Sequence, residues 1–484
     1  MATEVVLGVD LGTTATKVVA TRLDGRVVAT AEQGYALETG EHGQAVQDPQ
    51  TVLAAATKAL TECVERVDGE VRALSFSSAM HTLLALDGDG EPLTPALSWA
   101  DHRAADIAKR LRADGDLALE LHAATGAPVH PSFPLTKLAW FAEHEPELCQ
   151  RAVKWVGLKD YVLAKFTGQL VTEHSNASGT GMLDMRRLAW HEPALAIAGV
   201  SPEQLPRLVE PTKALGLADG IAGLRQGLPV IAGGGDGPLA NLGVGAVRPG
   251  MAALSLGTSG ALRVVRDRPG VDERGRVFCY ALADGLWVLG GAVSNGGVVA
   301  QWASEVFGVP VPELLAEAES EPPGAAGLLA LPYLLGERAP WWDPDPRAVL
   351  VGLRREHGRA VITRAMIEGV GQQLALVLDA VRDAGASVHE IRATGGAFRG
   401  PLWSSVVAAA FGQELSFVEG NEGSGVGAAL LGWRALGELP SLDAAADLVK
   451  PVGTVAPEEI DSRRMARSRP ALERIYEALR ELDS

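Results

Sequence analysis

Residues 5–20 read VVLGVDLGTTATKVVA, and this stretch decides the architecture of the chain. A short β-branched run, Val5 to Val9, is followed by Asp10-Leu11-Gly12-Thr13-Thr14 and by a second apolar run, Lys17 to Ala20. Apolar runs on either side of a glycine turn are typical of a strand hairpin. Residues 252–265, AALSLGTSGALRVV, have the same order of apolar run, Leu-Gly-Thr and apolar run. The spacing predicts an internal duplication with one α/β unit around each hairpin.

Helical patterns alternate with strand patterns outside the two hairpins. Asp48 and Pro49 open a helix in which apolar residues recur every three or four positions, and a strand pattern follows over 71–76. A long amphipathic helix over 361–381 precedes another strand near Ile391. Strands that alternate with helices predict an α/β fold.

The best candidate for a domain boundary is the stretch from Gly243 to Gly250, GVGAVRPG. Its glycines and proline interrupt regular structure, so we expect a hinge there. The sequence therefore predicts an N-terminal domain over 1–245 and a C-terminal domain over 246–484. The chain is expected to finish in a charged helix from about Pro470 to Leu482, packed on the C-terminal domain.

Composition excludes several classes of protein. The chain has 484 residues, of which 47% are apolar and 21% charged, as in ordinary globular proteins rather than disordered or disulfide-stapled ones. The net charge of −17 disfavours a polyanion-binding surface, so nucleic acid is not an expected partner. Cys63, Cys149 and Cys279 are isolated and are expected to be buried reduced thiols. With no signal-like start and no long apolar run, we expect a cytoplasmic protein without a membrane span.

Three glycine-containing segments could contact phosphate or nucleotide. Gly12 and Gly257 permit tight turns in which backbone N–H groups and Thr or Ser hydroxyls approach an anion closely. Two such hairpins in equivalent places predict a phosphate clamp, although each alone could be a plain turn. Gly395 and Gly396 stand where a strand ends and a helix begins, which suits a nucleotide contact.

Two carboxylates follow buried strands. Asp236 comes after a strand and a glycine run, where it could accept the proton of an attacking hydroxyl or simply cap the next helix. Asp10 stands beside the first phosphate turn and could hold Mg²⁺ through water. Met80 and His81 follow the strand over 71–76, and His81 could equally be a structural histidine.

Five motifs together resemble the FGGY family of carbohydrate kinases over essentially the whole chain: DLGTTATK (10–17), SFPLTKLAWF (132–141), SLGTSGALR (255–263), GERAPWWDP (336–344) and ATGGAFR (393–399). The resemblance implies two actin-like, ribonuclease-H-like α/β domains with ATP, Mg²⁺ and sugar in a cleft between them. It also implies Asp236 as the catalytic base, and a homodimer is an expectation at the level of the family.

The resemblance assigns residues to two sets by matching motif positions. The nucleotide set is Gly12, Thr13, Thr14, Lys17, Gly257, Thr258, Gly297, Gln301, Gly395 and Gly396. The substrate set is Met80, His81, Trp99 and Asp236. The chemistry of a substrate carboxylate adds Arg103 to this set, and Asp10, beside the first phosphate turn, is the predicted metal residue. Position 400, where some relatives have an asparagine, is glycine here, which leaves contacts to the adenine base open.

Within the family, the segments 77–81, 236–246, 257–263 and 290–302 are most similar to gluconate kinases. Xylulose kinases are the nearest rival, but Ala79 and Gly237 depart from their usual Gln and Asn. The resemblance therefore implies ATP-dependent conversion of D-gluconate to 6-phospho-D-gluconate, with xylulose or another polyol or ketose as the alternative. A gluconate carboxylate would need a cation, and the candidates are His81, Arg103 and Lys159. An actin-like ATPase and a catalytically silent sugar sensor are the alternatives from other classes.

Overall fold

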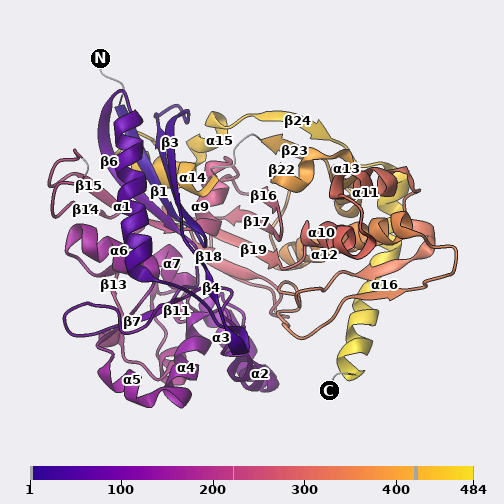
Figure 1. Cartoon of the computed structure of the whole chain (residues 1–484), viewed down its shortest axis with the longest axis horizontal. Helices are drawn as coiled ribbons and strands as arrows, with labels where there is room; N and C mark the ends of the chain where they lie inside the picture. The colour runs from indigo at the N-terminus through magenta and orange to yellow at the C-terminus, as the bar shows by residue number, and fades with distance from the viewer. Residues whose placement is uncertain (1–3, 222, 419–422, 483–484) are drawn as a thin grey trace. The chain divides into compact units, whose positions relative to one another are not determined.

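A computed structural model describes residues 4–221, 223–418 and 423–482 of the chain (Figure 1). By their internal contacts, these residues form two compact units. The first comprises the described residues within Met1–Pro249, Val265–Leu289 and Glu422–Lys450. The second comprises those within Gly250–Val264, Gly290–Asn421 and Pro451–Ser484. The division at 245/246 stays a prediction about the sequence, whereas the compact units are discontinuous because helix α14 (Gly423–Ala435) packs on β1 (Glu4–Leu11).

The first unit is built on a six-stranded sheet with the order β14-β15-β6-β1-β2-β3. Besides β1, its strands are β2 (Ala15–Thr21), β3 (Val27–Gly34), β6 (Glu70–Ser78), β14 (Ala214–Gly216) and β15 (Pro229–Gly235). As the sequence predicts, β1 and β2 form an antiparallel hairpin, and Leu11 pairs with Thr16 at its end. Strand β6 runs parallel to both β1 and β15. The carboxyl ends of β1, β6 and β15 therefore meet at one edge of the sheet.

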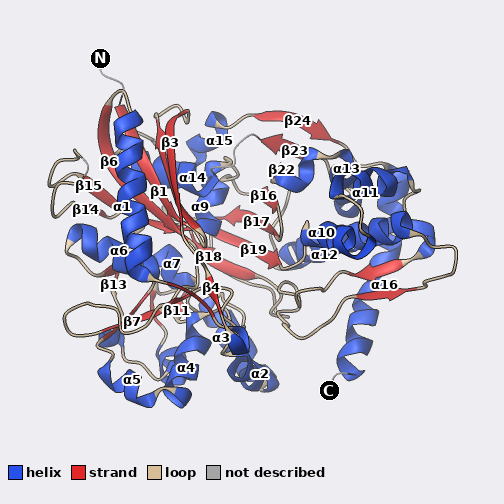
Figure 2. Ribbon diagram, in the orientation of Figure 1, coloured by secondary structure: helices blue, strands red, loops and turns tan. Residues whose placement is uncertain are grey.

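Successive residues of β1 face opposite sides of this sheet. Leu7 and Val9 belong to the core that also contains Leu60 of helix α1 (Pro49–Arg66). Gly8 faces α14, where a Cβ at its position would lie 1.9 Å from the carbonyl oxygen of Gly425. Helix α1 contacts β2 and β3, whereas α14 contacts β1, β6 and α9 (Asp236–Gly243) (Figure 2). The lack of a side chain at Gly8 thus allows α14 to approach the strand.

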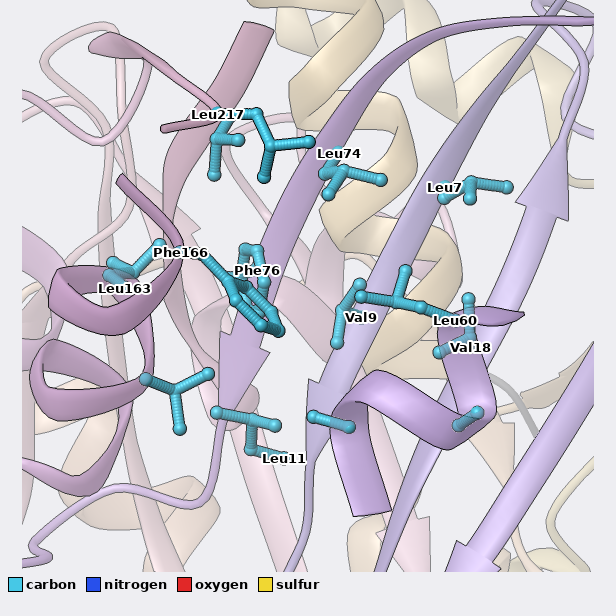
Figure 3. Packing of buried hydrophobic residues seen from close by; sticks show 14 of the residues in the cluster. Leu7, Val9, Leu11, Val18, Leu60, Leu74, Phe76, Leu163, Phe166 and Leu217 are labelled. Atoms are coloured by element: carbon cyan, nitrogen blue, oxygen red, sulfur yellow. The ribbon is translucent and has the colours of Figure 1, made fainter. Parts of the chain in front are cut away.

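The predicted start of α1 is confirmed. Asp48 is its N-cap and accepts hydrogen bonds from the backbone of Gln50 and Thr51, with Pro49 as the first helical residue. On the same side of the sheet, Phe76 of β6 contacts Phe166, their ring centroids 5.8 Å apart (Figure 3). These apolar contacts fix the strands whose ends present the polar residues described below.

The rest of the first unit consists of short elements. Its other strands are β4 (Glu38–Thr39), β5 (Ala45–Gln47), β7 (Leu84–Leu86), β8 (Ala96–Leu97), β9 (Lys154–Val156), β10 (Val171–Glu173), β11 (Leu183–Asp184), β12 (Ala189–Trp190) and β13 (Arg207–Val209). Its other helices are α2 (Ala105–Ala113), α3 (Gly115–Thr125), α4 (Pro134–His144), α5 (Pro146–Arg151), α6 (Leu158–Thr167), α7 (His174–Ser178), α8 (Glu192–Ala198) and α15 (Ala445–Leu448).

The second large sheet has the order β18-β19-β17-β16-β22-β23-β24. Its strands are β16 (Met251–Leu256), β17 (Gly260–Arg266), β18 (Phe278–Ala281), β19 (Trp287–Val293), β22 (Glu390–Thr394), β23 (Leu415–Val418) and β24 (Pro451–Val455). Strands β16 and β17 form an antiparallel hairpin, and β16 runs parallel to β22. The first sheet has the same arrangement in β1, β2 and β6, so the topology agrees with the internal duplication predicted from the sequence.

The second unit also contains β20 (Leu329–Leu331), β21 (Val349–Val351), α10 (Val298–Phe307), α11 (Val311–Ser320), α12 (Arg359–Asp383), α13 (Pro401–Phe411) and α16 (Glu459–Leu482). Among the described residues, α12 is the one helix long and apolar enough to cross a membrane, and 89% of its apolar window is buried as in a core helix. The final helix differs from expectation, since α16 begins at Glu459 and contains Pro470 in its interior. Proline usually marks a helix start, but the packing of α16 on α12, α13 and β20 continues the helix across it.

Two of the three cysteines agree with expectation. Cys63 and Cys279 are free and buried, and burial raises the pKa of each thiol to about 11. Cys149 is also free but is only half-buried, because the short helix α5 on which it lies contributes no fully buried residue. The expectation that all three thiols are buried is therefore wrong for Cys149.

Candidate functional site

The predicted base, Asp236, and the predicted metal residue, Asp10, lie at one edge of the first sheet. Asp10 is next to the last residue of β1 and pairs in register with Ser77 of β6. Asp236 directly follows β15, whose last residue, Gly235, pairs with Ser78 of β6. Because β1 and β15 flank β6, the two aspartates are separated by about two strand spacings, or about 10 Å.

The first phosphate turn joins β1 to β2. The backbone N–H of Gly12 donates to the carbonyl oxygen of Ala15, which closes the turn around Thr13 and Thr14. Gln47 Nε2 donates to the carbonyl oxygens of Gly12 and Thr13 at 3.1 and 2.9 Å. These two hydrogen bonds hold the carbonyl groups of the turn and so fix its backbone conformation, as an anion-binding turn requires.

Trp99, a predicted sugar contact, lies next to this turn. Its indole Nε1 donates a hydrogen bond of 3.0 Å to Thr13 Oγ1. A predicted substrate residue and a predicted phosphate residue are thereby brought into direct contact. Lys17 lies on β2 directly opposite Asp10 and forms a 3.4 Å ion pair with Glu32. The ammonium group of Lys17 is thus paired with a carboxylate on the neighbouring strand, β3.

Asp10 is oriented by a residue from a distant part of the sequence. Ser424 Oγ on α14 donates a hydrogen bond of 2.7 Å to Asp10 Oδ2. Asp10 lies on the same face of β1 as Gly8, which explains why α14 can reach it. Sequence reasoning missed Ser424. The run Gly423-Ser424-Gly425 is the signal that a closely packed helix begins there.

Asp236 is the first residue of α9, where the positive end of the helix dipole favours a negative charge. The backbone N–H of Gly237 donates to Asp236 Oδ1 at 2.7 Å. Met80 lies next to this position, because a Cβ on Gly235 would lie 2.6 Å from Met80 Cγ. The structure thus places Met80 against Gly235, the residue before Asp236, and the aspartate is half-buried at the strand end. The geometry allows Asp236 both roles, as a helix-start residue and as a base.

His81 has a backbone φ of 67°, in the left-handed region that non-glycine residues seldom adopt. Its Nδ1 hydrogen-bonds the carbonyl oxygen of Gly179 at 2.6 Å, and its ring packs on Phe133 with centroids 4.5 Å apart. Lys137 Nζ donates to the carbonyl oxygens of His81 and Ser98 at 2.7 and 2.6 Å. This buried lysine therefore ties together the segments that bear His81 and Trp99, and its burial lowers the pKa of the ammonium group to about 7.

The three candidate cations for a substrate carboxylate differ in their partners. Arg103 is bonded through Nε and Nη2 to Asp101, which is fully buried, and its guanidinium lies 5.0 Å from the ring centre of Trp140. Lys159 is fully buried and is paired with Glu173, so it is excluded as a contact for a substrate. His81 and Arg103 remain the candidates.

Five of the six nucleotide residues predicted in the second unit line one pocket of about 730 Å³, and Gly395 is not among its lining residues. Gly257 and Thr258 come from the turn between β16 and β17, Gly297 and Gln301 from the start of α10, and Gly396 from the turn after β22. Arg399, Gly400 and Trp403 also line it. The structure thus brings five predicted residues together from three separate segments. A pocket of this size suits a nucleotide-sized ligand.

Glycines are required at two places around this pocket. A Cβ on Gly395, whose φ is 115°, would lie 2.2 Å from the carbonyl oxygen of Leu256. A Cβ on Gly297 would lie 2.9 Å from the carbonyl oxygen of Gly257. These close backbone approaches place the start of α10 against the phosphate turn, where the positive end of the helix dipole favours an anion.

The donor set for a metal is sparse. Among the residues that the structure describes, no group of three or more His, Cys, Asp or Glu side chains is placed to hold a metal ion. Mg²⁺ in phosphoryl transfer uses one or two carboxylates together with phosphate oxygens and water. Asp10, a hard oxygen donor fixed by Ser424 beside the first phosphate turn, fits that pattern.

Comparisons with known proteins agree over the whole chain. The model of the FGGY family of carbohydrate kinases, N-terminal domain, matches residues 5–243, and that of the C-terminal domain matches residues 252–436. A gluconokinase of Bacillus licheniformis is 37% identical, over 99% of this chain and 96% of its own. The crystal structure of a gluconate kinase from Lactobacillus acidophilus has a TM-score of 0.93 and 32% identity, covering 99% and 98% of the two chains. A ligand-bound xylulose kinase from the same species also has a TM-score of 0.93, with 33% identity and 98% of both chains covered.

Proposed function

Because the chain belongs to the FGGY family of carbohydrate kinases, we propose that it phosphorylates D-gluconate with ATP and releases 6-phospho-D-gluconate and ADP. The observation that supports this most directly is the placement of Asp236 directly after β15, next to Gly235, against which Met80 packs, and on the same sheet edge as Asp10. The 37% identity to a gluconokinase supports gluconate as the sugar.

In the proposed reaction, Asp236 accepts the proton of a terminal hydroxyl of the sugar. The hydroxyl oxygen forms a bond to the γ-phosphorus as the bond between that phosphorus and the β,γ-bridging oxygen breaks. The electron pair of the broken bond stays on ADP. The half-buried setting of Asp236 and its bond from Gly237 hold the carboxylate in one orientation for this proton transfer.

The nucleotide would be held by backbone groups rather than by a cluster of cations. Thr258 offers a backbone N–H group and a hydroxyl beside the start of α10 in the 730 Å³ pocket, and Gly12 and Thr13 form the equivalent turn in the first unit. When bound, Mg²⁺ neutralises charge on the phosphate oxygens, and Asp10 is the residue proposed to hold it. The adenine contacts are assigned to the segment around Gly396 and Gly400.

Substrate choice is the finer part of the proposal. Ala79 is buried and donates its backbone N–H to Leu11, and Gly237 has no side chain, so the amides expected in a xylulose kinase are missing beside the base. His81 and Arg103 are the proposed contacts for the gluconate carboxylate, because a cation is needed where water is excluded. Xylulose is the second candidate, since a xylulose kinase structure matches equally well in fold.

The proposal is tested by measuring ADP release from Mg–ATP with the purified protein and gluconate, xylulose, ribulose, glycerol or no sugar. We expect kcat/KM for gluconate to exceed that for xylulose by at least about tenfold, which corresponds to about 1.4 kcal/mol. A preference for xylulose would overturn the choice of sugar. ADP release that does not depend on any sugar would favour an ATPase, and binding without turnover would favour a sensor.

A further inference from the structure

The loop Gly336–Pro344 contains a carboxylate that the proposed mechanism does not use. Glu337 is 1% exposed. Its Oε1 accepts hydrogen bonds from the backbone N–H of Ser294 at 2.5 Å and of Arg338 at 2.8 Å. Its Oε2 accepts from Asn295 Nδ2 at 3.1 Å. A buried carboxylate is retained only where such donors compensate its lost hydration, and here two of the three belong to the segment after β19.

Two neighbours of Glu337 strengthen the same connection. Asn295 is fully buried, and its Nδ2 also donates to the carbonyl oxygen of Gly336 at 2.7 Å while its Oδ1 accepts from the N–H of Leu335 at 3.2 Å. Arg338 Nη2 donates to the carbonyl oxygen of Val293 at 3.0 Å. The loop therefore holds the segment 293–295 through both its donors and its acceptors.

That segment continues directly into the phosphate turn. The N–H of Gly296 donates to the carbonyl oxygen of Thr258 at 3.0 Å, and the N–H of Gly297 donates to that of Gly257 at 2.7 Å. The N–H of Val298 also donates to Thr258, at 3.2 Å. Any displacement of 294–295 is thus transmitted through two residues of hydrogen-bonded backbone to Gly257 and Thr258, which line the nucleotide pocket.

We propose that Glu337 is a positioning residue for nucleotide binding, which fixes the turn 294–298 and through it the phosphate-binding turn at Gly257–Thr258. The inference rests on the proposed function only in assigning the pocket to ATP. Burial raises the pKa of Glu337 to about 7, and the backbone and amide donors that face it partly offset that rise. Because Glu337 is buried, its carboxylate is hydrogen-bonded by these protein donors and not by solvent.

The test is Glu337→Gln. This change keeps the shape of the side chain but places an amide N–H₂ group opposite one of the groups that now donate a hydrogen bond to the Glu337 carboxylate. Binding of Mg–ADP is measured by calorimetry without sugar, and KM is measured for ATP and for the sugar that the wild type phosphorylates. We expect the Kd of Mg–ADP and the KM of ATP to rise at least about tenfold, with the sugar KM within twofold. A merely structural role would change both KM values or neither.

Glu368→Gln is the matched control. Glu368 is also a carboxylate of the second unit with a pKa raised by burial, and it accepts from the N–H of Gly324 and from Arg364, both at 2.9 Å. It does not line the nucleotide pocket. We expect its Kd for Mg–ADP to stay within twofold of the wild type, and an equal loss in both variants would overturn the proposal.

Arg338→Met provides a second variant, because Arg338 is only partly buried and its loss removes the hydrogen bonds to Val293 and Ser294 while Glu337 keeps its backbone and amide donors. If Glu337→Gln shows no cooperative thermal transition, that variant is unfolded, and Mg–ADP binding by Arg338→Met then tests the proposal. Weaker Mg–ADP binding with unchanged sugar KM supports the proposal, and unchanged binding overturns it. A wild-type protein that fails to bind Mg–ADP refutes the proposed function itself, which separates the two failures.

Discussion

Ser424 Oγ donates a hydrogen bond of 2.7 Å to Asp10 Oδ2, although the two residues are 414 positions apart in the sequence. The bond exists because α14, from near the end of the chain, packs against the first strand. A residue of the C-terminal segment therefore orients the carboxylate that we assign to Mg²⁺. Catalysis should depend on Ser424 as well as on Asp10.

Replacing Ser424 with Ala should lower kcat about tenfold. The change removes one charge-assisted hydrogen bond, worth about 1.5–3 kcal/mol, which orients Asp10 Oδ2. The measurement is the rate of ADP release as a function of Mg²⁺ concentration. Ser405→Ala is the control, since its hydroxyl donates to the backbone carbonyl of Leu402 within α13. Equal rates for Ser424→Ala and wild type would remove Ser424 from the account.

Gly8→Ala should destabilise the first unit strongly. The added methyl group would lie 1.9 Å from Gly425 O and 3.0 Å from Ala429 N, so α14 must move away from β1. We expect a loss of at least about 3 kcal/mol in the free energy of unfolding, at the upper end for overpacked cores. Gly88→Ala is the matched control, because a methyl group at that position would have no neighbouring atom within 4 Å. Urea unfolding of the two variants measures the difference, and similar midpoints would contradict the packing described here.

Asp160 should make stability depend on pH. Burial raises the pKa of this fully enclosed carboxyl from 3.8 to about 7, against the opposing effect of Lys159. Between about pH 4 and pH 7 the folded state holds a proton that the unfolded state has released, so this group lowers stability as pH rises through that window. Asp160→Asn should therefore gain stability relative to wild type from pH 4 to pH 7, by an amount on the order of 3 kcal/mol. Asp89→Asn, at an exposed position, should show no such trend, and a parallel trend in both variants would refute the assignment.

Much of the fold is predictable because its signals are local. The two hairpins depend on a glycine turn between apolar runs, and the start of α1 depends on Asp48 and Pro49. The early start of α16 is not predictable in this way, because its packing on α12 and α13 overrides the proline at 470. Likewise, no local pattern places α14 beside β1, since that contact joins the two ends of the chain.

The site divides along the same line. Residues in motifs, such as Gly257, Thr258 and Gly297, could be assigned by resemblance, and the structure gathers them in one pocket. Residues that hydrogen-bond the site from distant parts of the sequence could not be assigned in this way. Examples are Ser424, which bonds Asp10, and Glu337, which bonds Ser294. The exclusion of Lys159 also needed the structure, because only the fold reveals its buried pairing with Glu173. Sequence patterns thus identify groups that contact ligands better than the groups that orient them.

The most direct test of the account is the turnover of Asp236→Asn with gluconate and Mg–ATP. This change keeps the size of the side chain and its place at the start of α9 but removes the proton acceptor. We predict that kcat falls at least about a thousandfold while calorimetric Kd values for gluconate and Mg–ADP stay within threefold of wild type. Turnover within tenfold of the wild type would contradict the assignment of Asp236 as the base of a sugar kinase.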